Sequence, residues 1–267
     1  MSLIVSELYT YPVKGCAGVP LQSSEVTSRG LSLDRRWMVV DDTGVFLSQR
    51  SVPQLGLLQP LIREHEILLQ HERKGYHTLS IPIEDQQDAD SMEVVVWQDR
   101  VPAQRVSDQA DEWISKILGL SAHLVRMPES SQRLVDPEYA RNEEIVSFAD
   151  GYPFLIVGQA SLNDLNQRVG KVLSIKRFRP NIVFTGGAPY AEDGWQGFRI
   201  GETIFFAVKP CARCKVTTID PITQETGPEP LKTLATYRSE QNKVMFGMNL
   251  LSNGKGSISI GDEIELL

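Results

Sequence analysis

The sequence contains few cysteines and no long apolar run. Its three cysteines, Cys16, Cys211 and Cys214, are too few, and odd in number, for the disulfide framework of a small secreted protein. Residues 1–7 lack the basic and apolar segments of a secretion signal, and nowhere do about 18 apolar residues follow one another, as a membrane helix would require. We therefore expect a soluble protein of the reducing cytoplasm that has no membrane partner.

An excess of positive charge is also missing. The chain has 27 Lys and Arg against 34 Asp and Glu, a net charge of -7. This balance argues against a protein that wraps nucleic acid or docks on anionic lipid. A site for an anion must therefore be a local cluster of cations.

Helical patterns are scarce, whereas short β-prone runs recur along the chain. Apolar residues follow helical spacing at 107–118, 159–169 and 230–238, and most of the other patterned segments read as short strands between Gly, Pro and charged turns. The 267 residues suffice for one large or two small domains. We predict a mainly β protein of two packed β domains, with barrels favoured over an open sheet.

Two segments lack a regular pattern. Residues 127–147 are polar and irregular, which predicts a linker or a flexible loop. Residues 85–90, Asp-Gln-Gln-Asp-Ala-Asp, predict a solvated acidic turn.

The Cys-x-x-Cys pair holds two of the three cysteines. A thioredoxin-type dithiol follows a strand and opens a helix, but the β-branched run at 216–219 predicts that a strand continues after Cys214. A closed zinc site needs four nitrogen or sulfur ligands, and beyond Cys16 the chain offers four histidines without ligand-like pairing. The pair is expected in a tight connection between two strands.

Two interpretations of the cysteines remain open. In the first, one soft thiolate binds a metal that takes its other ligands from elsewhere, and Arg213 and Lys215 favour deprotonation of the thiol. In the second, both cysteines are packed thiols, since free cysteine is among the most buried residue types. The motif alone favours neither.

A basic run, Lys176-Arg177-Phe178-Arg179, leads into a strand that reads as buried. Strand alternation would place Arg177, Arg179 and Asn181 on one face. Arginine binds phosphate bidentately and an Asn amide can pair with the edge of a ring. This face is therefore a candidate site for a phosphate and a heterocycle.

Further cations lie near the N-terminus. Lys14 belongs to a loop with two glycines that can approach a ligand closely, although such a loop is more often an ordinary connection. Arg35 and Arg36 would alternate along a strand, so one is expected to point inward and to need an anionic partner.

Several motifs occur together in a characteristic order: Tyr11-Pro12-Val13-Lys14, Asp34-Arg35-Arg36-Trp37, residues 148–153 (Phe-Ala-Asp-Gly-Tyr-Pro), Phe178-Arg179-Pro180-Asn181 and residues 211–218 (Cys-Ala-Arg-Cys-Lys-Val-Thr-Thr). In this combination the chain resembles the MOSC-domain molybdenum-cofactor proteins, a family that includes bacterial hydroxylaminopurine-resistance proteins and the mitochondrial amidoxime-reducing component. The resemblance covers nearly the whole chain. It implies an N-terminal β-barrel domain at residues 1–120 and a MOSC β-barrel domain at 121–267.

The resemblance also implies a site. Cys214 would be the catalytic thiolate on the molybdenum of a molybdopterin cofactor, and Cys211 a neighbour that does not bind the metal. A soft thiolate suits such a metal, and the phosphate of the pterin would account for converging cations in an acidic chain. The residues implied to hold the phosphate and pterin are Lys14, Arg35, Arg179 and Asn181, with Gly151 and Tyr152 from a neighbouring loop.

The implied activity is reduction of N-hydroxylated compounds, such as amidoximes or N-hydroxylated nucleobases, to amines, a detoxifying reaction without pyridoxal phosphate. Two alternatives of another class are a cofactor carrier or sulfur-transfer module and a cofactor storage protein. At position 15 the chain has Gly where the eukaryotic relatives carry Ser, so any hydroxyl contact there is missing.

The resemblance further implies a separate electron donor. These 267 residues contain neither a nicotinamide or flavin glycine fingerprint nor the cysteines of an iron–sulfur cluster. We expect a flavodoxin- or ferredoxin-like partner with its reductase, docking near Arg213 and Lys215, and a monomeric protein that binds a small substrate and no nucleic acid.

Overall fold

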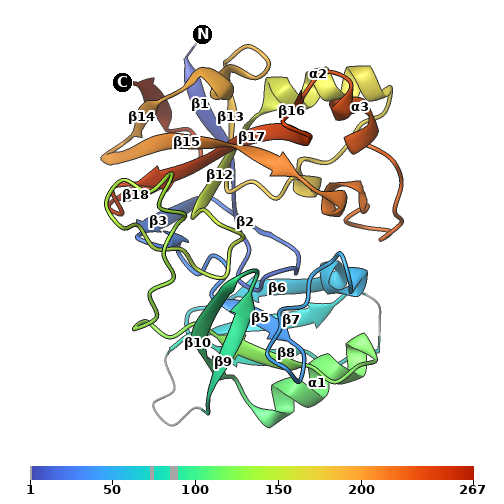
Figure 1. Cartoon of the computed structure of the whole chain (residues 1–267). Helices are drawn as coiled ribbons and strands as arrows, with labels where there is room; N and C mark the ends of the chain where they lie inside the picture. Colours follow the sequence, from blue (N-terminus) through green and yellow to red (C-terminus); the bar gives the residue numbers. More distant parts are fainter. Residues whose placement is uncertain (1, 73–74, 85–89) are drawn as a thin grey trace.

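The computed structural model describes residues 2–72, 75–84 and 90–267 and shows two β-rich bodies, one above the other (Figure 1). The predicted mainly β class with few short helices is confirmed. Of the predicted acidic turn, residues 85–89 lie outside the described residues. In the part of the chain that is described, no helix combines the length and the hydrophobicity needed to cross a membrane.

The upper body is a closed barrel. Seven strands follow one another in the order β12-β13-β1-β19-β14-β15-β17, and a further pairing between β12 and β17 closes the ring. Closure removes the exposed strand edges and encloses a core of apolar side chains. The strands are β1 (Leu3–Thr10), β12 (Phe154–Gly158), β13 (Ile182–Thr185), β14 (Gly197–Ile200), β15 (Thr203–Arg213), β17 (Lys243–Ser252) and β19 (Glu263–Leu266).

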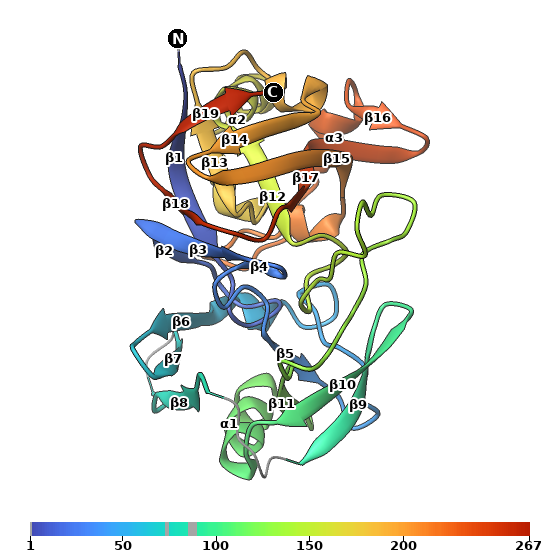
Figure 2. The ribbon, with the colours of Figure 1, turned by 90° about the vertical axis from the view of Figure 1, so that its left-hand side faces the viewer.

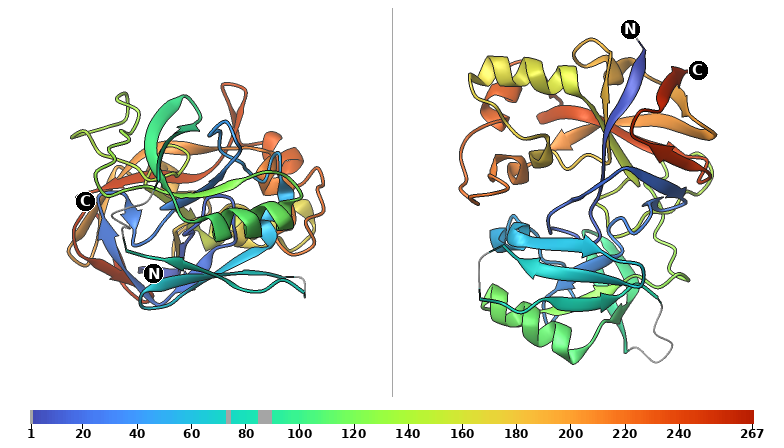
Figure 3. Two further views of the ribbon diagram at one scale, coloured as in Figure 1. Left: turned by 90° about the horizontal axis from the view of Figure 1, so that it is seen from below. Right: turned by 180° about the vertical axis from the view of Figure 1, so that it is seen from behind.

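Smaller elements surround this barrel. Two helices, α2 and α3, lie on one side of it (Figure 3), and both predicted helices are confirmed, α2 at the predicted bounds and α3 shorter than predicted. Short strands extend the barrel sheet or form a separate three-stranded sheet, β18-β3-β4. The elements are α2 (Gln159–Val169), α3 (Leu231–Ala235), β2 (Val19–Leu21), β3 (Ser23–Thr27), β4 (Gly30–Leu31), β16 (Ser239–Glu240), β18 (Ser257–Ser259), and the 3-10 turns η2 (Ile175–Arg177), η3 (Ala191–Gly194) and η4 (Lys215–Thr218).

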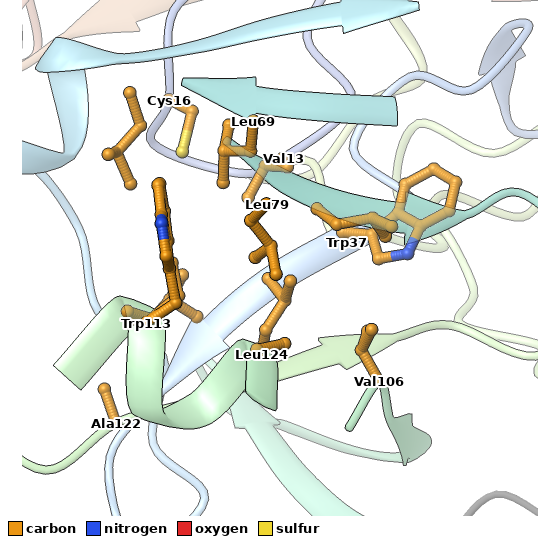
Figure 4. Packing of buried hydrophobic residues seen from close by; sticks show 14 of the residues in the cluster. Val13, Cys16, Trp37, Leu69, Leu79, Val106, Trp113, Ala122 and Leu124 are labelled. Atoms are coloured by element: carbon orange, nitrogen blue, oxygen red, sulfur yellow. The ribbon is translucent and has the colours of Figure 1, made fainter. Parts of the chain in front are cut away.

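The lower body contains two small sheets, β5-β11-β10-β9 and β6-β7-β8, and the helix α1. Ser107 caps α1 by accepting a hydrogen bond from the Ala110 N–H at 3.1 Å, the usual role of a serine at the start of a helix. Figure 4 shows Trp113 extending from α1 toward Cys16 in the apolar core. The elements are β5 (Trp37–Val40), η1 (Pro53–Leu57), β6 (Leu58–Ile62), β7 (Glu66–His71), β8 (Leu79–Pro82), β9 (Ser91–Val96), β10 (Asp99–Arg105), α1 (Asp108–Leu118) and β11 (His123–Arg126).

The chain passes between the two bodies several times, because the loop after β1 already packs Val13 and Cys16 into the lower core. Strands β1 to β4 belong to the upper body, residues from β5 to β11 form the lower body, and residues 127–153 run back upward without a helix or a multi-residue strand (Figure 2). Two strands lie on the other side of the predicted boundary at residue 120. Strand β1 belongs to the predicted N-terminal domain but lies in the upper barrel, and β11 belongs to the predicted MOSC domain but lies in the lower sheet.

Strands β15 and β17 are irregular where they carry the cysteine motif. Met248 pairs with Pro210 and Met245 pairs with Ala212, so Phe246 and Gly247 both lie opposite Cys211. This is a bulge, a feature that bends a strand and redirects its side chains. Gly247 has a φ of 78°, and the bulge lets Phe246 stack on Phe178 at 4.2 Å between ring centroids.

We predict that Gly247→Ala destabilises the protein more than Gly261→Ala. Both glycines have a positive φ, which costs an alanine about 1–2 kcal/mol. A Cβ at Gly247 would also lie 2.8 Å from Val157 and 2.9 Å from the Ile156 carbonyl, whereas at Gly261 it would meet nothing within 4 Å. Overpacking adds about 1–3 kcal/mol, so urea unfolding should separate the two variants, and equal losses would contradict the bulge argument.

Candidate functional site

A pocket of about 160 Å³ lies where loops of the two bodies meet. Its walls come from the loop after β1, the loop after β5, the segment before β12, the turn before β13 and the end of β15. The structure brings together all residues implied by the sequence motifs. They are Lys14, Arg35, Gly151, Tyr152, Arg179, Asn181 and Cys214.

The two cysteines of the motif have different surroundings. Cys211 lies in β15, and Cys214 precedes η4, whose turn is fixed by hydrogen bonds from the Thr217 N–H and hydroxyl to the Cys214 carbonyl at 3.1 and 2.9 Å. The predicted strand at 216–219 is therefore wrong, because these β-branched residues form a 3-10 turn and not a second strand. Both thiols are partly exposed.

Arg213 contacts the first cysteine and not the second. Its Nη1 lies 2.8 Å from the Cys211 sulfur, and its Nη2 donates to the Phe178 carbonyl at 2.5 Å. No hydrogen bond reaches the Cys214 sulfur from any described residue. Lys215 is exposed, so the expectation that both cations flank the Cys214 thiol is wrong for Arg213, and Cys214 keeps an unengaged sulfur at the pocket.

The basic run before β13 is not extended. Arg177 ends the turn η2 and Arg179 has a φ of 55°, so the predicted strand alternation is wrong. Arg177 is bound to the Asp220 carboxylate at 2.5 Å. Arg179 donates to the Cys16 carbonyl at 2.6 Å, and burial lowers the pKa of its guanidinium.

Two guanidinium groups lie over one tyrosine. The Cζ atoms of Arg35 and Arg179 are each 4.3 Å from the centroid of the Tyr11 ring. Such cation–π contacts stabilise a cation without neutralising it. Burial raises the pKa of Tyr11 to about 12, so the ring stays neutral beneath the two charges.

Asp34 connects the surrounding segments through a fully buried carboxylate. It pairs with the Arg35 guanidinium, accepts from the Tyr11 N–H at 2.9 Å, and accepts from the Asn181 amide at 3.1 Å. The prediction that an inward arginine needs an anion is confirmed for Arg35. Arg36 was expected to be solvated if Arg35 is inward, yet its side chain is only 14% exposed because it pairs with Glu129.

Asn181 is occupied within the chain. Its amide nitrogen donates to the Tyr9 carbonyl and to Asp34, and its amide oxygen accepts from the Leu155 N–H and from Arg35 at 3.2 and 3.1 Å. In this arrangement Asn181 positions Arg35. Its contact with a pterin stays a prediction.

Lys14 and Asp150 form an ion pair at the pocket. Lys14 Nζ lies 2.6 Å from the Asp150 carboxylate and 2.7 Å from the Phe148 carbonyl. Burial lowers the pKa of Lys14, which Asp150 partly offsets. Although desolvation acts in the opposite direction, the Lys14 ammonium holds the pKa of Asp150 well below its usual range.

Arg133 holds the loop that supplies Gly151 and Tyr152. Its guanidinium donates to the carbonyls of Ser147, Ala149 and Asp150 at 2.9, 2.5 and 3.1 Å, and pairs with Asp99 at 2.7 Å. The segment 127–147 is irregular, as predicted, but this buried arginine attaches it to the pocket wall.

The pocket suits an anionic ligand. Six cations line it, Lys14, Arg35, Arg50, Arg177, Arg179 and Arg213, against the single carboxylate of Asp150. Within residues 2–72, 75–84 and 90–267, no carboxylate pairs with Arg50, Arg179 or Arg213. The Tyr152 hydroxyl and Arg213 Nε are buried without a hydrogen-bond partner in the described structure. These free donors and charges fit a phosphate-bearing group.

The placement of the potential metal ligands among the described residues does not support a zinc site. Among the described residues, which include all cysteines and histidines, no group of three His, Cys, Asp or Glu is placed to hold a metal ion. A metal bound at Cys214 would therefore take its other ligands from a cofactor, because the described residues place no set of protein ligands around this thiol.

Two family models match this chain. The MOSC N-terminal beta barrel domain matches residues 2–121, and the MOSC domain matches residues 143–265. Mitochondrial amidoxime-reducing component 1 of Mus musculus is 32% identical over 98% of the chain and 82% of its own length. The chain belongs to the MOSC family. The predicted family resemblance is confirmed.

Other relatives of this MOSC protein are longer. Molybdenum cofactor sulfurase of Oryza sativa is 32% identical over 92% of the chain, but the match spans 32% of the sulfurase. Among solved structures, YuaD of Bacillus subtilis aligns with 99% of the chain at 12% identity and a TM-score of 0.46. The name of the sulfurase refers to the molybdenum cofactor, and the name of the mouse relative refers to the reduction of amidoximes.

Sequence reasoning missed several residues of the site. Asp34 and Asp150 stand in two of the motifs, yet the motifs assign only their neighbours. Arg133 is buried by partners far along the chain, such as Asp99, so a local pattern does not reveal it. Arg50 reaches the pocket from the lower body, and no motif marks it.

We predict that Asp34→Ala lowers the free energy of unfolding by about 3–5 kcal/mol, because it leaves a buried arginine unpaired. Glu265→Ala is the control, since Glu265 forms an exposed pair with Arg199 and such pairs contribute at most about 1 kcal/mol. Urea unfolding of both variants checks the difference. A loss at Asp34 no larger than at Glu265 would show that the buried carboxylate does not organise the site.

Proposed function

We propose that this MOSC protein is a molybdenum-cofactor-dependent oxidoreductase that reduces N-hydroxylated compounds, such as amidoximes or N-hydroxylated nucleobases, to amines. The observation that supports it most is the pocket itself, where one unengaged cysteine sulfur lies in a lining that includes Arg50, Arg179 and Arg213, which no carboxylate of the described residues pairs with. The similarity to amidoxime-reducing components over 98% of the chain supports the choice of reaction.

Each side chain has a role in this proposal. Cys214 supplies the thiolate for the metal. Arg179 and Lys14 supply charge for the phosphate, and Arg35, held by Asp34 and Asn181, adds a further positive charge over the Tyr11 ring. Burial raises the pKa of Tyr152, so its hydroxyl stays a hydrogen-bond donor at neutral pH. The cofactor, when bound, provides the two-electron chemistry at the metal.

The alternative is a cofactor carrier or sulfur-transfer module, favoured by the similarity to molybdenum cofactor sulfurases. A carrier and a reductase need the same cofactor-binding residues, so the pocket alone does not distinguish the two functions. Turnover of an N-hydroxylated substrate with a chemical reductant distinguishes them, because only the reductase converts the substrate.

The proposed reaction consumes two electrons, and these 267 residues contain no sequence motif for a redox cofactor that takes electrons from NAD(P)H. We propose that a flavodoxin- or ferredoxin-like donor with its reductase supplies them. Since Arg213 is used inside the pocket, the proposed docking surface is reduced to the exposed Lys215. Steering of an acidic donor would then depend on other surface cations as well.

We predict that Cys214→Ser abolishes the reductase activity and changes the spectrum of the bound metal, whereas Cys211→Ser is milder. The reason is that Cys214 would bind the metal, while Cys211 contacts Arg213, and loss of an outer-shell partner costs roughly 10- to 100-fold. Activity and metal content of both variants test this. Equal loss from both, with zinc stoichiometric to protein, would overturn it.

We predict that Arg179→Ala and Lys14→Ala reduce cofactor occupancy more than fold stability. Each removes a charge-assisted contact worth roughly 1.5–3 kcal/mol. Arg199→Ala is the matched control, because Arg199 is half exposed on β14 and pairs with Glu265. Molybdenum content and thermal melting are measured for all three, and full occupancy with a much lower Tm would make Lys14 and Arg179 structural residues.

A further inference from the structure

A second hollow adjoins the cofactor pocket, and we call it the vestibule. Its volume is about 1000 Å³, and it is lined by residues 97–101, 132–137 and 150–152 and by Lys209. Asp150, Gly151 and Tyr152 line both cavities. A Cβ added at Gly151 would meet nothing within 4 Å, so no atom crowds the space beside this shared residue.

Trp97 is the most unusual residue of the vestibule. It is the first of two residues that join β9 to β10, and its φ is 60°. Hairpin turns usually place Gly, Asn or Asp at such a position, because a bulky side chain is strained there. The indole is nevertheless 41% exposed. A strained, exposed tryptophan is hard to explain by packing alone.

The Trp97 ring is held in a defined orientation. Its Nε1 donates to the Asp150 carboxylate at 3.2 Å, Phe46 contacts it edge to face with centroids 4.9 Å apart, and the Arg50 guanidinium lies 4.3 Å from its centroid. Asp150 is also the partner of Lys14. The indole is therefore fixed directly beside the cofactor pocket, with much of its surface open.

The charges of the vestibule differ from those of the pocket. Three basic residues, Arg100, Arg133 and Lys209, face three acidic ones, Asp99, Asp136 and Asp150. Arg133 pairs with Asp99 at 2.7 Å, and Lys209 lies 4.0 Å from Asp136. The cofactor pocket has six cations and one carboxylate. An anion would thus prefer the pocket, and an uncharged ring the vestibule.

From these observations we infer that the vestibule is the substrate subsite and that Trp97 is its specificity-determining residue. The indole stacks on the planar ring of an uncharged aromatic or heteroaromatic N-hydroxylated substrate, whose N-hydroxyl group passes Gly151 toward the pocket. Aromatic stacking favours planar rings over saturated ones and does not depend on hydrogen bonds to individual ring atoms. The inference rests on the proposed function for the identity of the substrate, and on the vestibule alone for ring binding.

The test compares two probes of similar size, benzamidoxime and cyclohexanecarboxamidoxime, of which only the first has an aromatic face. Dissociation constants are measured by calorimetry on the cofactor-loaded protein, and KM and kcat separately. The variants are Trp97→Leu, which removes the aromatic ring, and Trp97→Phe, which keeps an aromatic ring but loses the hydrogen bond to Asp150. Tyr76→Leu is the control, because Tyr76 is 42% exposed and lies outside the vestibule.

We expect Trp97→Leu to weaken benzamidoxime binding by about 2- to 12-fold, the range that an aromatic pair contributes. The dissociation constant of the saturated probe and the kcat of Trp97→Leu should change little. Trp97→Phe should retain most of the preference for benzamidoxime, and Tyr76→Leu should bind both probes as the parent does. Equal effects on both probes, or a Phe variant as impaired as the Leu variant, would overturn the inference in favour of a structural role through Asp150. No measurable binding of benzamidoxime by the parent would also overturn it.

The two proposals fail separately. Trp97-dependent binding of benzamidoxime without its reduction would refute the reductase and keep the subsite. Reduction of both probes with no effect at Trp97 would keep the reductase and refute the subsite.

Discussion

The buried carboxylate of Asp34 is the interaction on which the rest of the site depends. It joins the loop that follows β1, the entry to the lower body and the residue before β13, through Tyr11, Arg35 and Asn181. A buried charge of this kind is tolerated only when donors satisfy it. The same bonds that satisfy Asp34 therefore fix the direction of the Arg35 side chain and connect the segment before β5 to the barrel at Tyr11 and Asn181.

Two cations of the pocket, Arg179 and Arg213, are anchored without being neutralised. Arg179 and Arg213 bind backbone carbonyls, and Arg179 also lies over an aromatic ring. Carbonyls and rings stabilise a guanidinium through partial charges and leave its full charge available. An acidic protein can in this way keep a locally positive site, while the neighbouring vestibule pairs most of its charges internally.

The sequence predicts much of the fold and most of the residues that form the site, but it does not predict how those residues are arranged. Helix α2 follows from periodicity and its glycine stop, and the site residues follow from the combination of motifs. Residues 216–218 have β-branched side chains and yet belong to η4, because hydrogen bonds to the Cys214 carbonyl outweigh a weak strand propensity. Arg35 and Arg179 have positive φ values, and Arg133 and Trp97 act through partners far away in the chain. Such long-range constraints leave no local pattern.

The exchange of strands between the two bodies has a consequence for biosynthesis. Leu3 pairs with Ile264 and Ile4 with Thr185, so the barrel cannot close until the ribosome has released the last strand. At about 5–20 residues per second, the first strand waits on the order of tens of seconds for its partners. The strands of the lower body lie within residues 37–126 and all emerge before β13 and β19, so the lower body can gain its strand pairs while β1 still lacks these two partners.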